Sequence, residues 1–288
     1  MPPNAGVRPH ARADMPLSST LRRTAIVTGA ASGLGRALCV RLARDGYEIA
    51  ICDIDLTGAA ETLRSVAAAG GTGRVERLDV TDSADWESLR ERLAKDWPHL
   101  DLLVNNAGVA VSGDVGRCPL DDWRWIIDAN LWGVIHGCHV CVDWLKRNPH
   151  GSHVINTASL AAIGSFPGMA ADNVTKAAVM SFSETLHSEL RRHGVGVTVL
   201  CPSFFPTALV DNGRFVSAAE RRIAQGEFKR TRLTSEAVAE AALRAVARKQ
   251  LYVILPAKAR LIWWIKRLSP ALFFRMVALE VNRRVSGR

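Results

Sequence analysis

The sequence predicts a single α/β domain in which helices cover both faces of a parallel sheet, followed by an amphipathic helical extension. Short β-branched runs alternate with helix-length segments through most of the 288 residues. The runs are apolar without period-two alternation, which is typical of strands buried on both faces. No internal repeat or linker divides the chain, and 48% apolar residues suffice for one large core.

The first strand is Thr24–Thr28, a β-branched run that precedes a glycine-rich turn and a helical pattern. The same reasoning assigns the other elements in order. We expect strands at 48–52, 74–78, 100–105, 153–157, 196–200 and 251–255. We expect helices at 36–45, 56–69, 83–96, 121–147, 170–193 and 235–248.

Three segments fall outside this alternation. Residues 1–20 contain several prolines and no apolar run, which predicts a flexible arm rather than a signal peptide. Within the domain at 21–256, residues 203–232 mix aromatic and charged side chains, which predicts a substrate loop with a short helix. The tail 257–288 is apolar, aromatic and basic, and Ser269–Pro270 should break its helix. Such a tail suits a membrane surface, an oligomer interface or a substrate lid.

The composition excludes some classes of function. The net charge is +9, but the basic residues are scattered and not interleaved with aromatic ones, which argues against nucleic-acid binding. The six cysteines lie in apolar segments without metal-like spacing, and this includes the pair Cys138 and Cys141. We therefore expect the cysteines to be reduced and to serve in packing, and we expect no metal site. A cytoplasmic protein is expected, whose tail can contact a membrane surface. No uncharged apolar stretch is long enough to span a bilayer.

A glycine-rich turn follows the first strand. Gly29 permits the tight turn, Gly33 lets the backbone approach a pyrophosphate, and Gly35 lets the helix pack on the strand. The N-terminus of that helix offers unpaired N–H groups and a positive dipole end to phosphates. We therefore predict a Rossmann-type dinucleotide site, with Ser32 and Leu34 completing the turn.

Asp53 indicates which dinucleotide binds. It ends the second strand, 18 residues after Gly35, where a carboxylate accepts hydrogen bonds from the adenosine ribose hydroxyls. The same charge repels a 2′-phosphate, so NAD is favoured over NADP. Arg36 and Arg74 keep NADP open as the alternative.

Over about residues 23–255, these and further motifs resemble the short-chain dehydrogenase/reductase family. Leu78-Asp79-Val80 resembles its adenine contact, Asn105-Asn106-Ala107-Gly108 its sheet-stabilising signature, and 201–207 its nicotinamide segment. The resemblance implies pairing through the two longest helices into a homodimer or homotetramer. It implies cofactor contacts at Asp79, Val80, Asn106, Ala107, Gly108, Lys176, Pro202 and Thr207, and catalytic roles for Asn130, Ser159 and Lys176.

One position departs from the family pattern. The family has a proton-donating tyrosine four residues before the lysine and thirteen after the serine, and both counts reach Asp172. The only tyrosines, Tyr47 and Tyr252, lie on other elements. A carboxylate is shorter than a phenol and, with a reference pKa near ~3.9, is ionised at neutral pH. Loss of one positioned general acid costs ~10²–10⁴-fold in rate.

Three hypotheses follow for Asp172. The first is an oxidoreductase of alcohols and ketones with impaired carbonyl activity, whether Asp172 is an engineered or a natural residue. The second is an imine reductase, in which the carboxylate stabilises an iminium. The third is a non-catalytic NAD-binding subunit or sensor.

The expected substrate is lipophilic. Phe166, Met169, Phe204, Phe205 and Leu209 flank the predicted nicotinamide pocket and are bulky and apolar. Ordinary core packing is the alternative for these residues.

Overall fold

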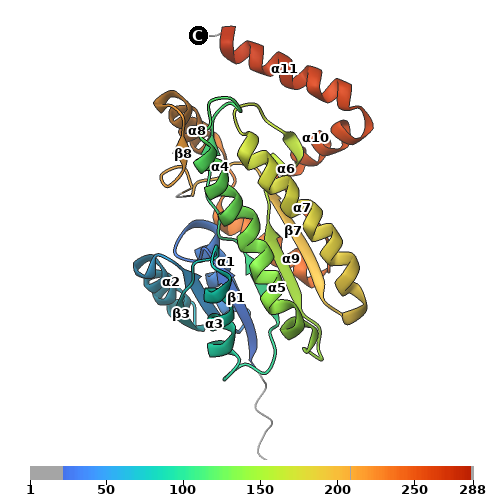
Figure 1. Ribbon diagram of the computed structural model, residues 1–288. Coiled ribbons are helices and arrows are strands. Elements are labelled where there is room, and N and C mark those ends of the chain that lie inside the picture. The colour runs from blue at the N-terminus through green and yellow to red at the C-terminus, as the bar shows by residue number, and fades with distance from the viewer. Residues whose placement is uncertain (1–21, 208, 287–288) are drawn as a thin grey trace, which may run out of the picture.

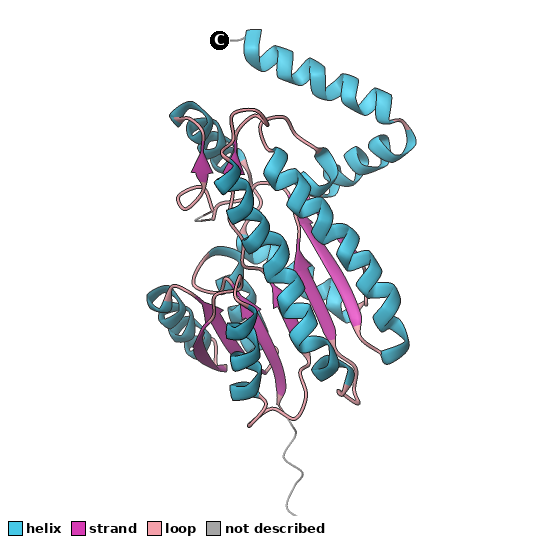
Figure 2. Cartoon of the chain, in the orientation of Figure 1, coloured by secondary structure: helices cyan, strands magenta, loops and turns pink. Residues whose placement is uncertain are grey.

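Seven parallel strands form the central sheet of the computed structural model, in the order β3-β2-β1-β4-β6-β7-β9 (Figure 2). The strands are β1 (Arg23–Thr28), β2 (Tyr47–Asp53), β3 (Thr72–Arg77), β4 (Leu102–Asn105), β6 (His153–Thr157), β7 (Gly196–Pro202) and β9 (Tyr252–Leu255). The predicted fold class and each predicted strand are thereby confirmed, with small shifts at the strand ends. The structure describes residues 22–207 and 209–286, so the arm expected at 1–20 lies outside the described residues.

Helices cover both faces of this sheet (Figure 1). One face carries α1 (Gly33–Arg44), α2 (Leu56–Ala68) and α9 (Ser235–Ala247), and the other carries α3 (Ser83–Leu93), α5 (Gly133–Lys146) and α7 (Ala170–Leu190). Successive residues of β1 enter different cores, because side chains alternate along a strand: Ala25 and Val27 pack towards α1, and Ile26 packs towards α3. All six cysteines are free and buried, as expected of packing residues.

The helix expected at 121–147 is present but is not α-helical throughout. It consists of α4 (Leu120–Ile127), a π-helical turn (Asp128–Trp132) and α5. Hydrophobic spacing did not reveal the π-helical turn, because the turn is itself helical and differs from an α-turn only in its wider hydrogen-bond spacing. The turn contains Asn130, which becomes important at the site.

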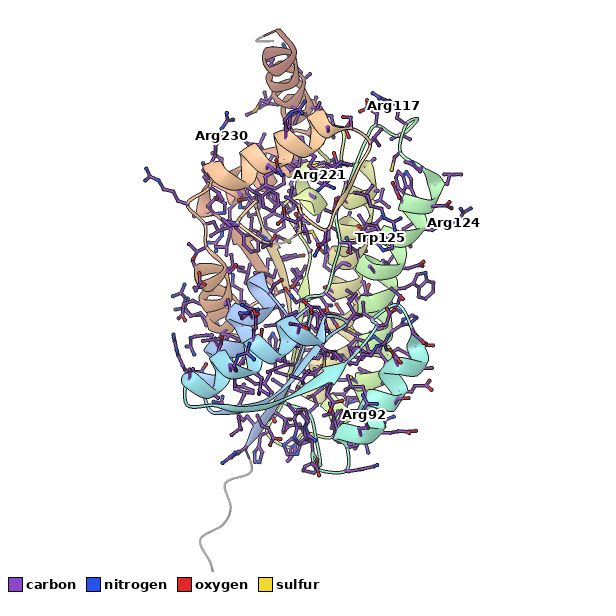
Figure 3. The ribbon with its side chains drawn as sticks, turned by 90° about the vertical axis from the view of Figure 1, so that its left-hand side faces the viewer. Arg92, Arg117, Arg124, Trp125, Arg221 and Arg230 are labelled. Atoms are coloured by element: carbon purple, nitrogen blue, oxygen red, sulfur yellow. The ribbon has the colours of Figure 1, made fainter. Side chains whose placement is uncertain are left out.

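A small lobe stands above the carboxyl ends of the strands. It contains a two-stranded parallel sheet, β5 (Val111–Ser112) with β8 (Arg214–Phe215), and α8 (Ala218–Arg230). The helix expected in this segment was short, whereas α8 has 13 residues. Ser217 precedes it as the N-cap, and its hydroxyl accepts a hydrogen bond from the Glu220 amide. Figure 3 shows Arg221 and Trp125 in this upper region and Arg92 towards the opposite end of the sheet.

The tail forms two helices, α10 (Ala257–Leu268) and α11 (Pro270–Ser286), with the predicted break at Ser269. On α10, Trp263 packs against Tyr252 of β9 with ring centroids 5.0 Å apart. No helix among the described residues is both long and apolar enough to cross a membrane.

Candidate active site

The predicted site residues gather where the strand order reverses, between β1 and β4. Ligands of open α/β sheets bind beyond the carboxyl ends of the strands at such a switch point. The glycine turn after β1, the Asn106–Gly108 segment after β4 and Ser159 after β6 all follow neighbouring strands. The topology therefore brings together segments that are more than 120 residues apart in the sequence.

The glycine turn has no room for side chains. Gly29 and Gly33 have φ angles of +62° and +50°, which favour glycine. A Cβ atom on Gly35 would lie 2.1 Å from the Gly29 carbonyl oxygen. Ser32 precedes α1 and its side chain caps none of the helix N–H groups. Those groups stay available to an anion, so the turn fits a dinucleotide phosphate. Leu34 contributes only backbone here, because its side chain is buried in the core.

Thr28 ties this turn to the next strand, a role that the sequence reasoning missed. Its hydroxyl oxygen accepts hydrogen bonds from the Asn106 and Ala107 amides at 2.9 and 3.0 Å. The Asn106 side chain in turn donates to the carbonyls of Thr28 and Gly29. The position of Thr28 at the end of the strand was the available signal, but its partners 78 residues away were not visible in the sequence.

Asp53 lies beside the glycine turn, where the sequence placed it. One carboxylate oxygen accepts a hydrogen bond from the Ala31 amide at 2.9 Å. Arg36 pairs with Glu61 at 3.0 Å, and Arg74 pairs with Asp96 at 2.7 Å. Both arginines that left NADP open are therefore engaged with carboxylates of their own.

Four further cofactor predictions lie at or just beyond the ends of strands. Asp79 accepts hydrogen bonds from the amide and hydroxyl of Thr81, and the side chain of Val80 packs against Gly133. The carbonyl of Pro202 accepts a hydrogen bond from the Leu160 amide at 2.8 Å. The methyl group of Thr207 would lie 3.4 Å from a Cβ atom on Gly33, so the loop after β7 closes over the glycine turn.

Asn130 points from the π-helical turn towards the segment after β4. Its side chain donates to the Val109 carbonyl at 2.9 Å and accepts from the Val109 amide at 2.7 Å. A Cβ atom on Gly108 would lie 2.9 Å from Asn130 Oδ1 and 3.5 Å from Lys176 Nζ. Gly108 therefore has to be glycine, and Asn130 and Lys176 meet at that residue.

Lys176 is buried on α7, and its ammonium group donates a hydrogen bond to the Thr157 carbonyl at 3.0 Å. Burial lowers the pKa of Lys176, while the Asp172 carboxylate opposes that change. Ser159 begins the segment after β6, and its hydroxyl accepts a hydrogen bond from the Ala161 amide. Asn130, Ser159 and Lys176 thus converge at the carboxyl ends of β4 and β6.

Asp172 is buried one turn before Lys176, with 6% of its surface exposed. Its carboxylate accepts a hydrogen bond from the Val111 amide of β5 at 3.1 Å. Burial raises its pKa to about 6, although Lys176 and the Val111 amide both favour the ionised form. The sequence reasoning counted the effect of Lys176 and missed both the burial and the partnership with Val111.

The aromatic residues assigned to the substrate occupy different environments. Phe205 is buried in the core beside α9, which is the alternative that the sequence left open. Phe204 is half-buried and packs on Phe228 of α8, with ring centroids 5.3 Å apart. Phe166 is half-buried, and its backbone is held by two hydrogen bonds with the Asn173 side chain. Met169, also half-buried, precedes α7 and bridges to Gly113.

Comparisons with known proteins agree with this arrangement. The short chain dehydrogenase family profile matches residues 23–214. The SadH protein of Mycobacterium tuberculosis is 31% identical over 272 residues, which cover 93% of this chain and 98% of that protein. The 1-deoxy-11-beta-hydroxypentalenate dehydrogenase of Streptomyces avermitilis is 32% identical over 82% of this chain and 86% of its own.

A solved structure is similar as well. The crystal structure of a short chain dehydrogenase/reductase from Burkholderia phymatum, in complex with NAD, superposes with a TM-score of 0.79 at 31% sequence identity. The match covers 86% of this chain and 95% of that one.

Proposed function

The chain belongs to the short-chain dehydrogenase family, and on that premise we propose an NAD-dependent oxidoreductase of lipophilic alcohols and ketones with impaired carbonyl reduction at neutral pH. One observation carries the second half of this proposal. Asp172 is buried on α7 one turn before Lys176, at the position where the resemblance to the family implies a tyrosine.

NAD is the cofactor that the turn supports best. Gly29, Gly33 and Gly35 leave space for the pyrophosphate, and the first turn of α1 carries no acidic residue. Asp53 stands at the end of β2, where it would accept hydrogen bonds from the ribose hydroxyls and repel a 2′-phosphate. The ion pairs of Arg36 and Arg74 favour the same choice.

In the proposed reaction, the cofactor carries the hydride and the side chains of the protein position the substrate and transfer the proton. NAD, when bound, supplies or accepts the hydride. Ser159 would orient the substrate oxygen. Lys176 would bind the nicotinamide ribose through its ammonium group. A carbonyl that becomes an alcohol also needs a proton on oxygen, and Asp172 is the acid within this set.

Asp172 is a poor donor at neutral pH for two reasons. With a pKa of about 6 it is mostly ionised at pH 7, and an anion cannot donate a proton. Its side chain is also shorter than the phenol it replaces by about 3 Å, a gap that one water molecule can bridge. Protonation below pH 6 would restore a donor, so the impairment should depend on pH.

The lipophilic substrate class rests on Phe166, Met169 and Phe204. All three are half-buried apolar side chains on the segments that follow β6 and β7. The name of the Streptomyces relative describes dehydrogenation of a hydroxypentalenate, which agrees with oxidation of an alcohol.

Imine reduction is the second candidate, and the burial of Asp172 favours it. A carboxylate in a desolvated site stabilises a neighbouring cation more strongly than one in water. An iminium substrate is such a cation, whereas the alkoxide formed from a ketone is repelled. An acid with a pKa of about 6 is also suited to protonate an imine near neutral pH.

The test compares wild type, Asp172→Tyr and Asp172→Asn in NADH oxidation with panels of ketones and cyclic imines. We expect Asp172→Tyr to raise ketone reduction at pH 7 by about 10²-fold or more. Asp172→Asn has nearly the size of the native residue but no titratable proton, and should reduce ketones no faster than the wild type.

The other outcomes are equally informative. Ketone reduction by the wild type at the rate of Asp172→Tyr would contradict the proposal. Imine-selective turnover would establish the second candidate. No turnover in any variant, with NADH binding intact by fluorescence titration, would identify a non-catalytic NAD-binding protein instead.

A further inference from the structure

The outer side of α10 is apolar. Leu261, Trp264 and Leu268 are spaced i, i+3, i+7 and are 64%, 53% and 79% exposed. The opposite side of the helix contains Ala259, which is buried against the domain. The helix therefore presents apolar side chains to solvent in a stripe, which is the reverse of an ordinary surface helix.

The next helix carries an exposed apolar stripe of its own. Leu272, Met276 and Leu279 of α11 share one side at i, i+4, i+7 and are all about half exposed or more. Phe273 is buried where α11 meets α10, and Figure 1 shows α11 projecting beyond the sheet and its covering helices. Seven of the 15 large apolar residues that are exposed in the described part of the chain lie between 257 and 279. We call Leu261, Trp264, Leu268, Leu272, Met276 and Leu279 the tail face.

Positive charge surrounds the tail face. Residues 257–279 contain five basic residues and no acidic one. Lys258, Arg260, Arg267 and Arg275 are exposed, and the guanidinium of Arg267 stacks over the ring of Trp263 at 4.8 Å. An apolar stripe with a tryptophan, flanked by cations, matches the apolar boundary and negative surface of an anionic bilayer.

We propose that the tail face docks on the surface of an anionic phospholipid bilayer, with α10 and α11 lying in the interfacial plane. The charge pattern disfavours the other simple occupant, a second copy of the same face. The tail 257–288 contains eight basic residues and one acidic residue, Glu280, so a two-fold pairing would bring many cations together with one carboxylate per chain to offset them.

The docked helix would be connected to the candidate site. On the inner side of α10, Lys266 donates hydrogen bonds to the Ile163 carbonyl at 2.7 Å and the Ser165 hydroxyl at 2.9 Å. These residues belong to the segment that begins with Ser159 and ends at Phe166. The bilayer would then lie next to the substrate-binding end of the domain and supply lipophilic substrate from the membrane. That last step rests on the proposed function, whereas the docking itself does not.

The test is flotation of the full-length protein with vesicles of phosphatidylcholine, alone or mixed with phosphatidylglycerol. We expect binding to the mixed vesicles, weakened at high salt, and little binding to phosphatidylcholine alone. The double variant Leu261→Ser/Leu268→Ser should lower the partition coefficient at least about tenfold. Leu120→Ser, which removes a leucine 69% exposed on α4, is the matched control and should bind like the wild type.

Charge reversal gives an independent arm. Arg260→Glu/Arg275→Glu should lower binding to the mixed vesicles at least about tenfold. Arg64→Glu/Lys95→Glu makes the same change in charge at exposed positions on and near other helices, and should have a small effect. Circular dichroism and NADH binding report that each variant is folded, independently of turnover.

Three results would overturn the proposal. One is an absence of flotation with the anionic vesicles at low salt. Another is equal loss in the tail variants and their matched controls. The third is a lower oligomeric mass for Leu261→Ser/Leu268→Ser by light scattering with unchanged flotation, which would assign the tail face to a second copy of the chain.

Discussion

Burial of Asp172 and Lys176 disfavours the charged form of both side chains. Burial raises the pKa of the acid to about 6 and lowers the pKa of the base, and each residue partly offsets the change in the other. The Val111 amide gives Asp172 a structural role as well, because it joins α7 to β5. From the sequence alone, Asp172 is expected to be ionised and unable to donate a proton. In the folded chain its pKa is raised to about 6, so part of the population is protonated near neutral pH.

This residue predicts an acidic pH profile. If the protonated Asp172 donates the proton, as proposed, ketone reduction should fall as pH rises through about 6. The rate should rise about fivefold from pH 7 to pH 6 and level off below about pH 5. The measurement is the initial rate of ketone reduction per bound NADH between pH 4.5 and 8. Asp172→Asn should show no such step, and a profile of the same shape in both proteins would refute the assignment.

Among the secondary-structure elements, turns that depart from regular α-helix position the residues of the candidate site. The π-helical turn at Asp128–Trp132 directs Asn130 at Val109, as such turns often do at functional sites. The short helix α6 (Ala161–Gly164) ends at Ser165, whose φ of +49° turns the chain back towards α7. Lys266 of α10 holds that turn from outside through its two hydrogen bonds.

Removing the Lys266 contact should loosen this segment. In Lys266→Met the Ile163 carbonyl and Ser165 hydroxyl lose their donor, at a cost of about 1 kcal/mol in the free energy of unfolding. We expect faster hydrogen exchange at the amides of 163–166 and a higher KM for a lipophilic ketone. Lys258→Met, on the same helix but exposed, is the control. Equal exchange in the two variants would show that the contact does not restrain the segment.

At the scale of the molecule, α5 and α7 leave a groove of about 460 Å³ between them, away from the site. Ile135, Phe182 and Leu186 are among the apolar residues that line it. Nearby, Trp132 of the π-helical turn and Val174 of α7 are about half exposed. A two-fold partner packed on this surface would cover Trp132, Val174 and the exposed area of the groove, which supports the pairing that the family resemblance implies.

We therefore predict that this surface forms a homodimer. Light scattering after size exclusion should give at least twice the mass of 31.3 kDa for the wild type. Ile135→Arg places a charge in the groove and should yield monomer. Ile223→Arg, at a 43% exposed position on α8, is the matched control and should leave the mass unchanged. A monomeric wild type, or an Ile135→Arg variant of unchanged mass, would contradict the prediction.

The amino-acid sequence by itself determined the parallel sheet, the glycine turn after β1 and the spacing that sets Asp172 one turn before Lys176. These features are encoded within short stretches, in hydrophobic periodicity and in the backbone freedom of particular glycines, so no distant partner is needed to read them.

Only the tertiary structure decided which partners these residues meet. The Val111 amide on Asp172, the Thr157 carbonyl on Lys176 and the Lys266 contact with Ile163 each join segments 19 to 103 residues apart. The tertiary structure likewise decided the pKa of Asp172, the burial of Phe205 and the exposure of the tail face. Burial and hydrogen bonding depend on what the rest of the chain brings alongside a residue, and local spacing carries no record of that.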